Sequence, residues 1–340
     1  MSDASRADAM ARLDRLTKPV GALGRLEALA AQLADIADCC PPPMPAPAAV
    51  AVFAGDHGVW SEGVSPWPQA VTAQMVANFT AGGAAINVIA RQVGASVTVV
   101  DVGVATPCAS AAGLIEANVR RGTRNLVCAA AMTDAECAQA LAVGAEVAGN
   151  LISGGARLLV TGDMGIANTT PSAALIAAYT GSKASAVTGR GTGIDDETLA
   201  RKTAVVERAL SRLAHTHPSP SPTTVLAELG GLEIAALAGF ILAAATGRIP
   251  VVIDGVIALA AAVAAAEIDP SAKKVMIAGH RSTEPGAGIA LAHLGLRPLL
   301  DLDLRLGEGT GACLAVPIVQ TAARILHEMA TFDDAGVTEK

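Results

Sequence analysis

Aromatic side chains are nearly absent from this sequence, since Trp, Tyr and Phe together make up 2% of its 340 residues. Charged residues are also few, at 16%, whereas hydrophobic residues reach 52%. Ala, Val, Leu and Ile must therefore fill the core, and such small side chains let helices pack closely against a sheet. This composition favours an α/β protein, and the length suits one large domain or a large domain with an appendage.

Long uninterrupted apolar runs are missing as well. The most apolar region, Gly230 to Ile268, is broken by Glu233, Arg248, Pro250 and Asp254. Its longest uncharged run, residues 234–247, is shorter than the ~20 residues that a bilayer-spanning helix needs. The first residues include acidic side chains and lack the apolar segment of a signal peptide. We therefore expect a cytoplasmic protein that does not contact membranes.

No basic stripe is visible, and the net charge is −7. Nucleic acid is therefore not expected as a partner, because its phosphates are bound by clustered Lys and Arg. The six cysteines form no C-x-x-C pair and no Cys/His spacing typical of a metal site. We expect reduced, mostly structural thiols at Cys39, Cys40, Cys108, Cys128, Cys137 and Cys313.

Short apolar runs recur along the chain, and each ends in a cluster of small, acidic or basic residues. Continuous apolar runs of this length fit strands buried on both faces, and the Ala-rich segments between them fit crossover helices. We predict a doubly wound, mostly parallel, Rossmann-like sheet, with ligands bound beyond the carboxyl ends of its strands. The expected strands are Ala49–Ala54, Ser96–Val100, Arg157–Val160, Pro250–Ile253 and Lys274–Ile277.

Helical patterns flank this sheet region at both ends of the sequence. Apolar residues recur at helical spacing between Val20 and Asp38, and the proline-rich residues 40–47 then prevent the helix from continuing. The pattern from Ala312 to Phe332 is helical again. We therefore predict a small helical subdomain made of residues 1–40 and 312–340, and an α/β domain over residues 48–311 that carries the site.

The segment Gly162–Pro171 is a candidate phosphate site. Thr170 followed by Pro171 is a good N-cap and first-turn pair for a helix that runs to Tyr179. A strand, a small-residue loop and a helix N-terminus present free amides and a positive dipole end, which suits a phosphate. Asn168 and Thr169, with Thr170, add side-chain donors. The alternative is an ordinary capped turn between a strand and a helix.

Glu308 lies between two glycines, just before an apolar helix. Flanking glycines leave the carboxylate on bare backbone that a ligand can approach closely. A carboxylate at a helix N-terminus is also favoured by the helix dipole, so a charge–dipole pairing without chemistry is the alternative.

Two further patterns are less specific. The glycine-rich loop Thr188–Gly193 matches neither the P-loop nor the dinucleotide fingerprint, and Lys202 follows on an expected helix, where most lysines are solvated. Asp56, His57 and His280 stand at strand ends and leave a metal-dependent hydrolase open as an alternative, although no H-E-x-x-H pattern accompanies them.

Taken in order, these clusters closely resemble the nicotinate-nucleotide:dimethylbenzimidazole phosphoribosyltransferases. The similarity runs from about Leu13 to Phe332, and its motifs together are highly specific although each is weak alone. The matching stretches are Lys18–Glu27 (KPVGALGRLE), Ala54–Val64 (AGDHGVWSEGV), Val71–Ala73 (VTA), Gly162–Pro171 (GDMGIANTTP), Val252–Gly255 (VIDG) and Arg305–Gly311 (RLGEGTG).

The resemblance implies a reaction. A ring nitrogen of 5,6-dimethylbenzimidazole attacks the anomeric carbon of nicotinate mononucleotide, nicotinate leaves, and α-ribazole 5′-phosphate forms with inversion. The resemblance makes Glu308 the general base, which removes the proton that the other ring nitrogen must lose. It implies no metal and no cofactor. A homologue that binds the nucleotide without turnover is the remaining alternative, and the presence of Glu308 argues against it.

The resemblance also implies the rest of the site and a homodimer, whose interface the apolar helices could supply. Many family members have glutamate where this chain has Asp163, which is therefore a secondary catalytic candidate. Aspartate is one methylene shorter, so a direct hydrogen bond to the base can be lost or bridged by water, and base specificity altered. The substrate-binding residues that it implies are Gly165, Asn168, Thr169 and Thr170 at the phosphate, Lys202 and Arg305 near the nucleotide, and Asp56, His57, Trp67 and Met75 at the aromatic base.

Overall fold

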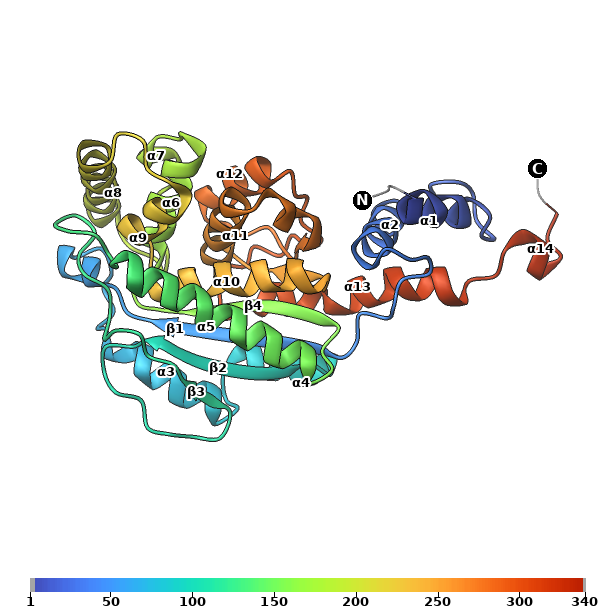
Figure 1. Cartoon of the computed structure of the whole chain (residues 1–340), viewed down its shortest axis with the longest axis horizontal. Helices are drawn as coiled ribbons and strands as arrows, with labels where there is room; N and C mark the ends of the chain where they lie inside the picture. Colours follow the sequence, from blue (N-terminus) through green and yellow to red (C-terminus); the bar gives the residue numbers. More distant parts are fainter. Residues whose placement is uncertain (1–3, 339–340) are drawn as a thin grey trace.

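The structure is a computed structural model, and it describes residues 4–338. Its centre is a parallel sheet of six strands in the order β3-β2-β1-β4-β5-β6 (Figure 1). This confirms the predicted doubly wound α/β fold. The strands are β1 (Ala48–Gly55), β2 (Ser96–Gly103), β3 (Leu114–Glu116), β4 (Leu158–Met164), β5 (Val251–Ile253) and β6 (Met276–Ala278).

Two details of the sheet differ from the prediction. The edge strand β3 was not expected, because its short and half-exposed run carries no alternating or continuous apolar signal. Strand β6 begins at Met276 rather than Lys274, since Pro270–Val275 forms a 3-10 turn (η2) that leads into it. The central strand β1 is buried along its whole length, as expected for a strand covered on both faces.

Helices cover both faces of the sheet. Helices α3 and α4 connect β1 to β2, whereas α5 and α10 pack against each other on the side that faces the viewer in Figure 1. The helices are α1 (Ala4–Asp14), α2 (Arg25–Ala37), α3 (Ala70–Thr80), α4 (Ala85–Val93), α5 (Asp134–Ser153), α6 (Thr169–Thr180), α7 (Ala184–Val187), α8 (Asp196–Thr216), α9 (Pro222–Leu229), α10 (Leu232–Gly247), α11 (Val256–Ile268), α12 (Pro285–Leu294), α13 (Thr310–Glu328), α14 (Phe332–Ala335) and the 3-10 turn η1 (Gly58–Glu62).

The contact between α5 and α10 shows how the small side chains are used. A methyl group added at Gly144 of α5 would lie 1.7 Å from the carbonyl oxygen of Ala236, and one at Gly239 of α10 would lie 1.9 Å from that of Leu141. The two backbones therefore touch at these glycines, which no larger residue would permit. The composition predicted close approach of helices to the sheet; at these glycines the close approach is between two helices.

Segments from both ends of the chain meet beside the sheet. Helices α1 and α2 contact each other and α13 (Figure 1). Leu16 forms an antiparallel bridge with Thr331. Helix α2 begins at Arg25 rather than near Val20, because turns occupy residues 20–24. Helix α13 also contacts β4 and β5, so the predicted boundary at residue 312 falls inside a helix that serves both parts. The division into two domains remains a prediction.

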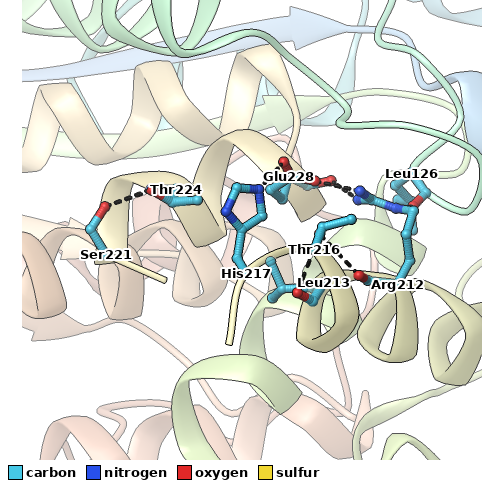
Figure 2. Close-up of polar contacts among 8 residues, drawn as sticks. All are labelled: Leu126, Arg212, Leu213, Thr216, His217, Ser221, Thr224 and Glu228. Carbon is cyan, nitrogen blue, oxygen red and sulfur yellow. Dashed lines mark hydrogen bonds and ion pairs between the residues drawn. The ribbon is translucent and has the colours of Figure 1, made fainter. Parts of the chain in front are cut away.

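Hydrogen bonds and ion pairs of Arg212, His217 and Glu228 connect helices α8 and α9 to the loop before α5 (Figure 2). Arg212 donates from Nε to the carbonyl of Leu126 (2.8 Å) and from Nη2 to the carbonyl of Glu228 (3.0 Å). The Glu228 carboxylate pairs with Arg212 and lies 2.9 Å from Nε2 of His217. These hydrogen bonds hold α8 and α9 together, and α6 packs against both helices.

Within residues 4–338, no helix is both long and apolar enough to cross a bilayer. The apolar helices α10 and α11 are instead buried against the sheet and against each other. All of the cysteines are free thiols, and Cys137 and Cys313 are buried.

Candidate active site

A cavity of about 400 Å³ opens at the carboxyl ends of the strands, where the sequence predicted the site. Its wall is mostly apolar and comes from Trp67, Val71, Met75, Met164, Ile166, Val256, Ile257 and Leu306. Polar side chains interrupt this wall at a few places, namely Asp163, Asn168, Thr169, Thr192, His280, Ser282, Glu284, Arg305 and Glu308. Such a pocket suits a flat apolar ring together with a polar group.

The structure brings most of the predicted residues to this cavity. Those that line it are Trp67, Met75, Asp163, Gly165, Asn168, Thr169, Arg305 and Glu308. Those that do not line it are Asp56, His57, Thr170 and Lys202.

Glu308 occupies a strained turn. Gly307, Glu308 and Gly309 have φ angles of 86°, 62° and 91°, so three consecutive residues lie in the left-handed region. For a non-glycine residue this conformation costs roughly 1–3 kcal/mol and persists only where the surroundings enforce it. The Asp254 carboxylate supplies that enforcement, because it accepts the amides of Gly309 (3.2 Å) and Ala312 (2.9 Å) at the start of α13.

The Glu308 carboxylate is buried, with 6% of the residue exposed. Its Oε2 accepts a hydrogen bond from the amide of Ile86 (3.3 Å), in the first turn of α4. Burial raises the pKa of Glu308, the nearby charge of Asp254 raises it further, and the Ile86 amide opposes both. The alternative of a charge–dipole pairing is therefore partly correct, but the helix whose N-terminus pairs with the Glu308 carboxylate is α4 and not α13. The same carboxylate nevertheless lines the cavity with a raised pKa, as a general base requires.

Asp163, at the end of β4, is a second buried acid in the same wall. Its Oδ2 accepts a hydrogen bond from Nδ2 of Asn168 (3.0 Å), and its Oδ1 has no partner among residues 4–338. Burial raises the pKa of Asp163 well above its usual range, and the charges of Asp254 and Glu233 add to this. A neutral carboxylic acid is therefore favoured here.

The turn after β4 differs from the prediction by one or two residues. Helix α6 begins at Thr169, with Asn168 rather than Thr170 in the N-cap position. Thr170 already lies inside the first turn, fully buried, and its hydroxyl has no partner in the described part of the chain. The predicted cap at Thr170 is wrong, because Ala167 takes a left-handed conformation and turns the chain into the helix earlier. Thr169 is the threonine that faces the cavity.

Lys202, on α8, is not the solvated residue that its helix suggested. It is 1% exposed and donates from Nζ to Oγ1 of Thr169 (2.7 Å) and to the carbonyl of Gly189 (3.0 Å). Burial lowers the pKa of Lys202 to about 8, and the charge of Glu284 opposes this shift. Arg305 lies nearby and donates to the carbonyl of Gly191 (3.2 Å). A cation therefore stands directly behind the threonine at the cavity wall.

Asp56 and His57 are buried and do not line the cavity. The Asp56 carboxylate accepts the hydroxyl of Thr72 (2.7 Å) and the amide of Ala105 (2.8 Å). His57 lies 2.8 Å from the carboxylate of Glu233, and both side chains are fully buried. These contacts give both residues a supporting position outside the cavity wall, and the direct substrate contact that the resemblance implied stays a prediction.

The predicted histidines stand in separate acid–histidine pairs. His57 is paired with Glu233, whereas Nε2 of His280 lies 3.4 Å from the carboxylate of Asp254. Among residues 4–338, no group of three or more His, Cys, Asp or Glu side chains is gathered closely enough to hold a metal ion. The geometry therefore gives the metal-hydrolase alternative no ligand set.

Three residues of the site were not singled out from the sequence as having a role there. Asp254 holds the Glu308 turn, Glu284 lines the cavity beside the glycine-rich loop, and Ile86 contributes only its backbone amide. The position of Asp254 after an expected strand was a usable signal. The amide of Ile86 leaves no trace in a side-chain pattern.

Comparisons with known proteins agree with this geometry. A family model described as "Phosphoribosyltransferase" matches residues 1–337. A nicotinate-nucleotide–dimethylbenzimidazole phosphoribosyltransferase of Salinispora tropica is 59% identical over 340 residues, covering 96% of this chain and 93% of its own. One of the same name from Chloroflexus aurantiacus is 54% identical and covers 100% of this chain and 96% of its own.

Solved structures show the same likeness in three dimensions. The crystal structure of a nicotinate-nucleotide–dimethylbenzimidazole phosphoribosyltransferase from Thermus thermophilus superposes with a TM-score of 0.95 at 48% sequence identity. The match covers 100% of both chains.

Proposed function

Because this chain belongs to the nicotinate-nucleotide–dimethylbenzimidazole phosphoribosyltransferase family, we propose that it transfers the phosphoribosyl group of nicotinate mononucleotide to 5,6-dimethylbenzimidazole. The products are α-ribazole 5′-phosphate and nicotinate, in the assembly of the nucleotide loop of cobalamin. The observation that carries this proposal is the Glu308 carboxylate, buried in a mostly apolar cavity and held there by an enforced left-handed turn.

Glu308 acts as the general base. One nitrogen of the benzimidazole forms a bond to the anomeric carbon of the ribose, and the bond from that carbon to the pyridinium nitrogen of nicotinate breaks, with its electron pair returning to the pyridine ring. The other benzimidazole nitrogen loses its proton to Glu308, so that the product ring is neutral. A carboxylate with a raised pKa accepts this proton more readily than an ordinary one.

Asp163 has a different part in the same wall. Its raised pKa favours the protonated form, in which the oxygen that has no partner among residues 4–338 is able to donate a hydrogen bond to a nitrogen or to a water molecule beside the benzimidazole. A methyl group built at Gly307 would lie 3.2 Å from both of its carboxyl oxygens, so Asp163 packs directly against the Glu308 turn. This contact supports a role for Asp163 in positioning the benzimidazole relative to the turn that carries Glu308.

The phosphate of the mononucleotide lies against the turn from Gly165 to Thr169. Thr169 lines the cavity there, and its hydroxyl accepts a hydrogen bond from Lys202, which stands behind it, with Arg305 in the same wall. Cationic side chains favour phosphate, and a hydroxyl at the wall is able to donate to it. Thr170 has no part in this placement, because it is fully buried and does not line the cavity.

The dimethylbenzimidazole occupies the apolar part of the cavity. Trp67 and Met75 line it with Val71 and Leu306, and flat or flexible apolar groups of this kind suit a methylated bicyclic ring. Alignment of two planar rings with the sugar between them provides much of the rate, because it converts a bimolecular step into one between held groups.

We further propose a homodimer in the cytoplasm. The sequence suggested that apolar helices form the dimer interface. Helices α10 and α11 are buried within the single chain, so they do not supply that interface. Large apolar side chains are instead exposed near the cavity, where Trp67, Leu302 and Leu306 are 50%, 54% and 57% accessible, and this surface supports association. Free cysteine thiols support a reducing compartment.

The experiment is direct. Purified protein is incubated with nicotinate mononucleotide and 5,6-dimethylbenzimidazole, and the products are separated by chromatography and identified by mass. Equal amounts of nicotinate and α-ribazole 5′-phosphate are expected, with no loss of rate after exhaustive chelation. Release of nicotinate without the riboside product would contradict the proposed transfer.

A further inference from the structure

The glycine-rich loop Thr188–Gly193 lies between two buried side chains of opposite charge. From α8, Nζ of Lys202 donates to the carbonyl of Gly189 (3.0 Å). From the residue before α12, Oε1 of Glu284 accepts the amide of Gly191 (2.7 Å). The loop is therefore held from both sides, and Gly191 itself lines the cavity.

Glu284 packs against bare backbone. A methyl group built at Gly189 would lie 2.1 Å from Oε2 of Glu284, so the carboxylate occupies the space that any side chain at position 189 would need. Glu284 is 8% exposed, and it lines both the main cavity and an adjoining cavity of about 410 Å³. A carboxylate buried to this extent needs a reason, because it loses most of its hydration.

The ordinary explanation for an acid at this position does not apply. Glu284 is the N-cap residue of α12, where acids often bind the first amides of the helix, yet its side chain makes no capping hydrogen bond. Its carboxylate is directed to the loop instead. The structure thus uses this acid to hold the loop and not to begin the helix.

We propose that Glu284 is a positioning residue of the nucleotide site: its carboxylate holds the Gly189–Gly191 backbone in place and keeps a negative charge beside the Lys202 ammonium. The inference rests on the proposed function, in which Lys202 and Thr169 receive the phosphate. Glu284 acts through the loop and through Lys202, and makes no bond to the reacting atoms.

The electrostatics give the inference a distinctive consequence. Burial lowers the pKa of Lys202 to about 8, and Glu284 opposes that shift. Lys202 is charged below this pKa and neutral above it, so affinity for the phosphate falls as the pH rises through it. Among the neighbouring charges, Arg305 is bound to the carbonyl of Gly191, and Arg190 is paired with Asp196 at the exposed start of α8. Removal of the Glu284 charge must therefore lower the pKa of Lys202 further.

The test measures binding of nicotinate mononucleotide by calorimetry between about pH 6 and about pH 10. Glu284→Gln keeps the shape and an oxygen that can accept the Gly191 amide, but removes the charge. We expect its loss of affinity to begin at a pH lower by roughly half a unit or more than in the wild type, with near-normal affinity at pH 6. Glu284→Ala removes both the charge and the acceptor, so affinity should already be about tenfold lower at pH 6, and its further loss should begin at the same lower pH as in Glu284→Gln.

Glu267→Gln is the matched control. Glu267 on α11 pairs with His293 on α12 at 2.8 Å, so this variant also removes a carboxylate contact of α12, away from the cavity. Its binding curve should coincide with that of the wild type. If the Glu284→Gln curve also coincides with the wild type across the range, the inference is wrong. Because binding is measured without the base, this result is distinct from a failure of the wild-type protein to form α-ribazole 5′-phosphate, which would overturn the proposed function.

Discussion

The carboxylate of Glu308 accepts a hydrogen bond from the backbone amide of Ile86, across 3.3 Å. This bond joins the strained turn before α13 to the first turn of α4, and it fixes the direction in which the carboxylate enters the cavity. An amide at a helix N-terminus favours the ionised form, whereas burial favours the protonated form. The balance leaves a carboxylate that is able both to take a proton and to release it.

Asp254 should be needed to hold that turn. Asp254→Asn replaces one acceptor oxygen with an amide group, so the amide of Gly309 or of Ala312 loses its partner in the core. An unsatisfied buried donor costs about 1–3 kcal/mol. We expect a lower melting temperature and a kcat reduced by roughly tenfold or more, with the KM for nicotinate mononucleotide little changed.

Asp269→Asn is a control for that variant, since Asp269 also accepts a backbone amide, from Ser271 at 2.9 Å, but at an exposed turn. It should leave kcat unchanged. An equal loss of kcat in both variants would show that the Asp254 effect is not specific to the turn.

Thr169 and Thr170 should behave differently, although they are neighbours of the same type. Thr169→Ala removes a hydroxyl that lines the cavity and accepts from Lys202, and we expect affinity for the mononucleotide to fall about tenfold. Thr170→Val replaces a buried hydroxyl that has no partner among the described residues, so binding should be unchanged and stability equal or higher. Calorimetric titration of both variants checks this, and equal effects would contradict the observed start of α6.

Asp163 should lower stability as the pH rises. The pKa of Asp163 is raised in the folded protein, so its protonated form stabilises the fold. This stabilisation is fully present below the ordinary pKa of aspartate, and it is lost as the pH rises through the pKa of the folded protein. Asp163→Asn cannot ionise and escapes this loss. We expect its melting temperature to exceed that of the wild type by roughly 2 °C or more at about pH 9, with a smaller difference at about pH 5.

Thermal unfolding at both pH values tests that expectation, with Asp303→Asn as a control, since Asp303 is an exposed aspartate. If Asp163→Asn raised the melting temperature at low pH but not at high pH, the sign of the effect would be reversed and the account of Asp163 refuted.

Arg212 should matter for stability and not for binding. Arg212→Met breaks its bonds to Leu126 and Glu228 and leaves the Glu228 carboxylate largely buried (Figure 2). We expect the free energy of unfolding to fall by about 1–3 kcal/mol. Arg208→Met removes an exposed pair with Glu62 and should cost less. Denaturant titrations compare the two, and a loss of mononucleotide affinity in folded Arg212→Met would contradict this assignment.

The sequence was a good guide wherever the topology of the sheet decided the outcome. Carboxyl ends of parallel strands meet at one edge, and Asp163, Asp254 and His280 do lie there, beside Glu308 from the loop before α13. Asp56 also follows a strand, but its carboxylate is directed inward to Thr72 and Ala105. The rule places a residue at the edge of the sheet and does not say which way its side chain points.

Lys202 shows where a signal was present and was overlooked. It lies on the face of α8 that also carries Val205, Val206, Ala209 and Leu213, all of them buried. A lysine within the apolar stripe of a helix is expected to be buried and paired. The start of α6 and the contact with Ile86 depended on backbone conformation and on tertiary packing, and no local pattern in the sequence encodes either.

Replacement of Glu308 by glutamine is the most direct measurement of the proposed chemistry. Glutamine keeps the shape and a hydrogen-bond acceptor for the Ile86 amide but cannot take a proton at neutral pH. We predict that Glu308→Gln lowers kcat for α-ribazole 5′-phosphate formation by roughly 10² or more, while calorimetric affinity for nicotinate mononucleotide is largely kept. A variant that binds the mononucleotide normally and turns over at a near-wild-type rate would contradict the assignment of Glu308 as the base.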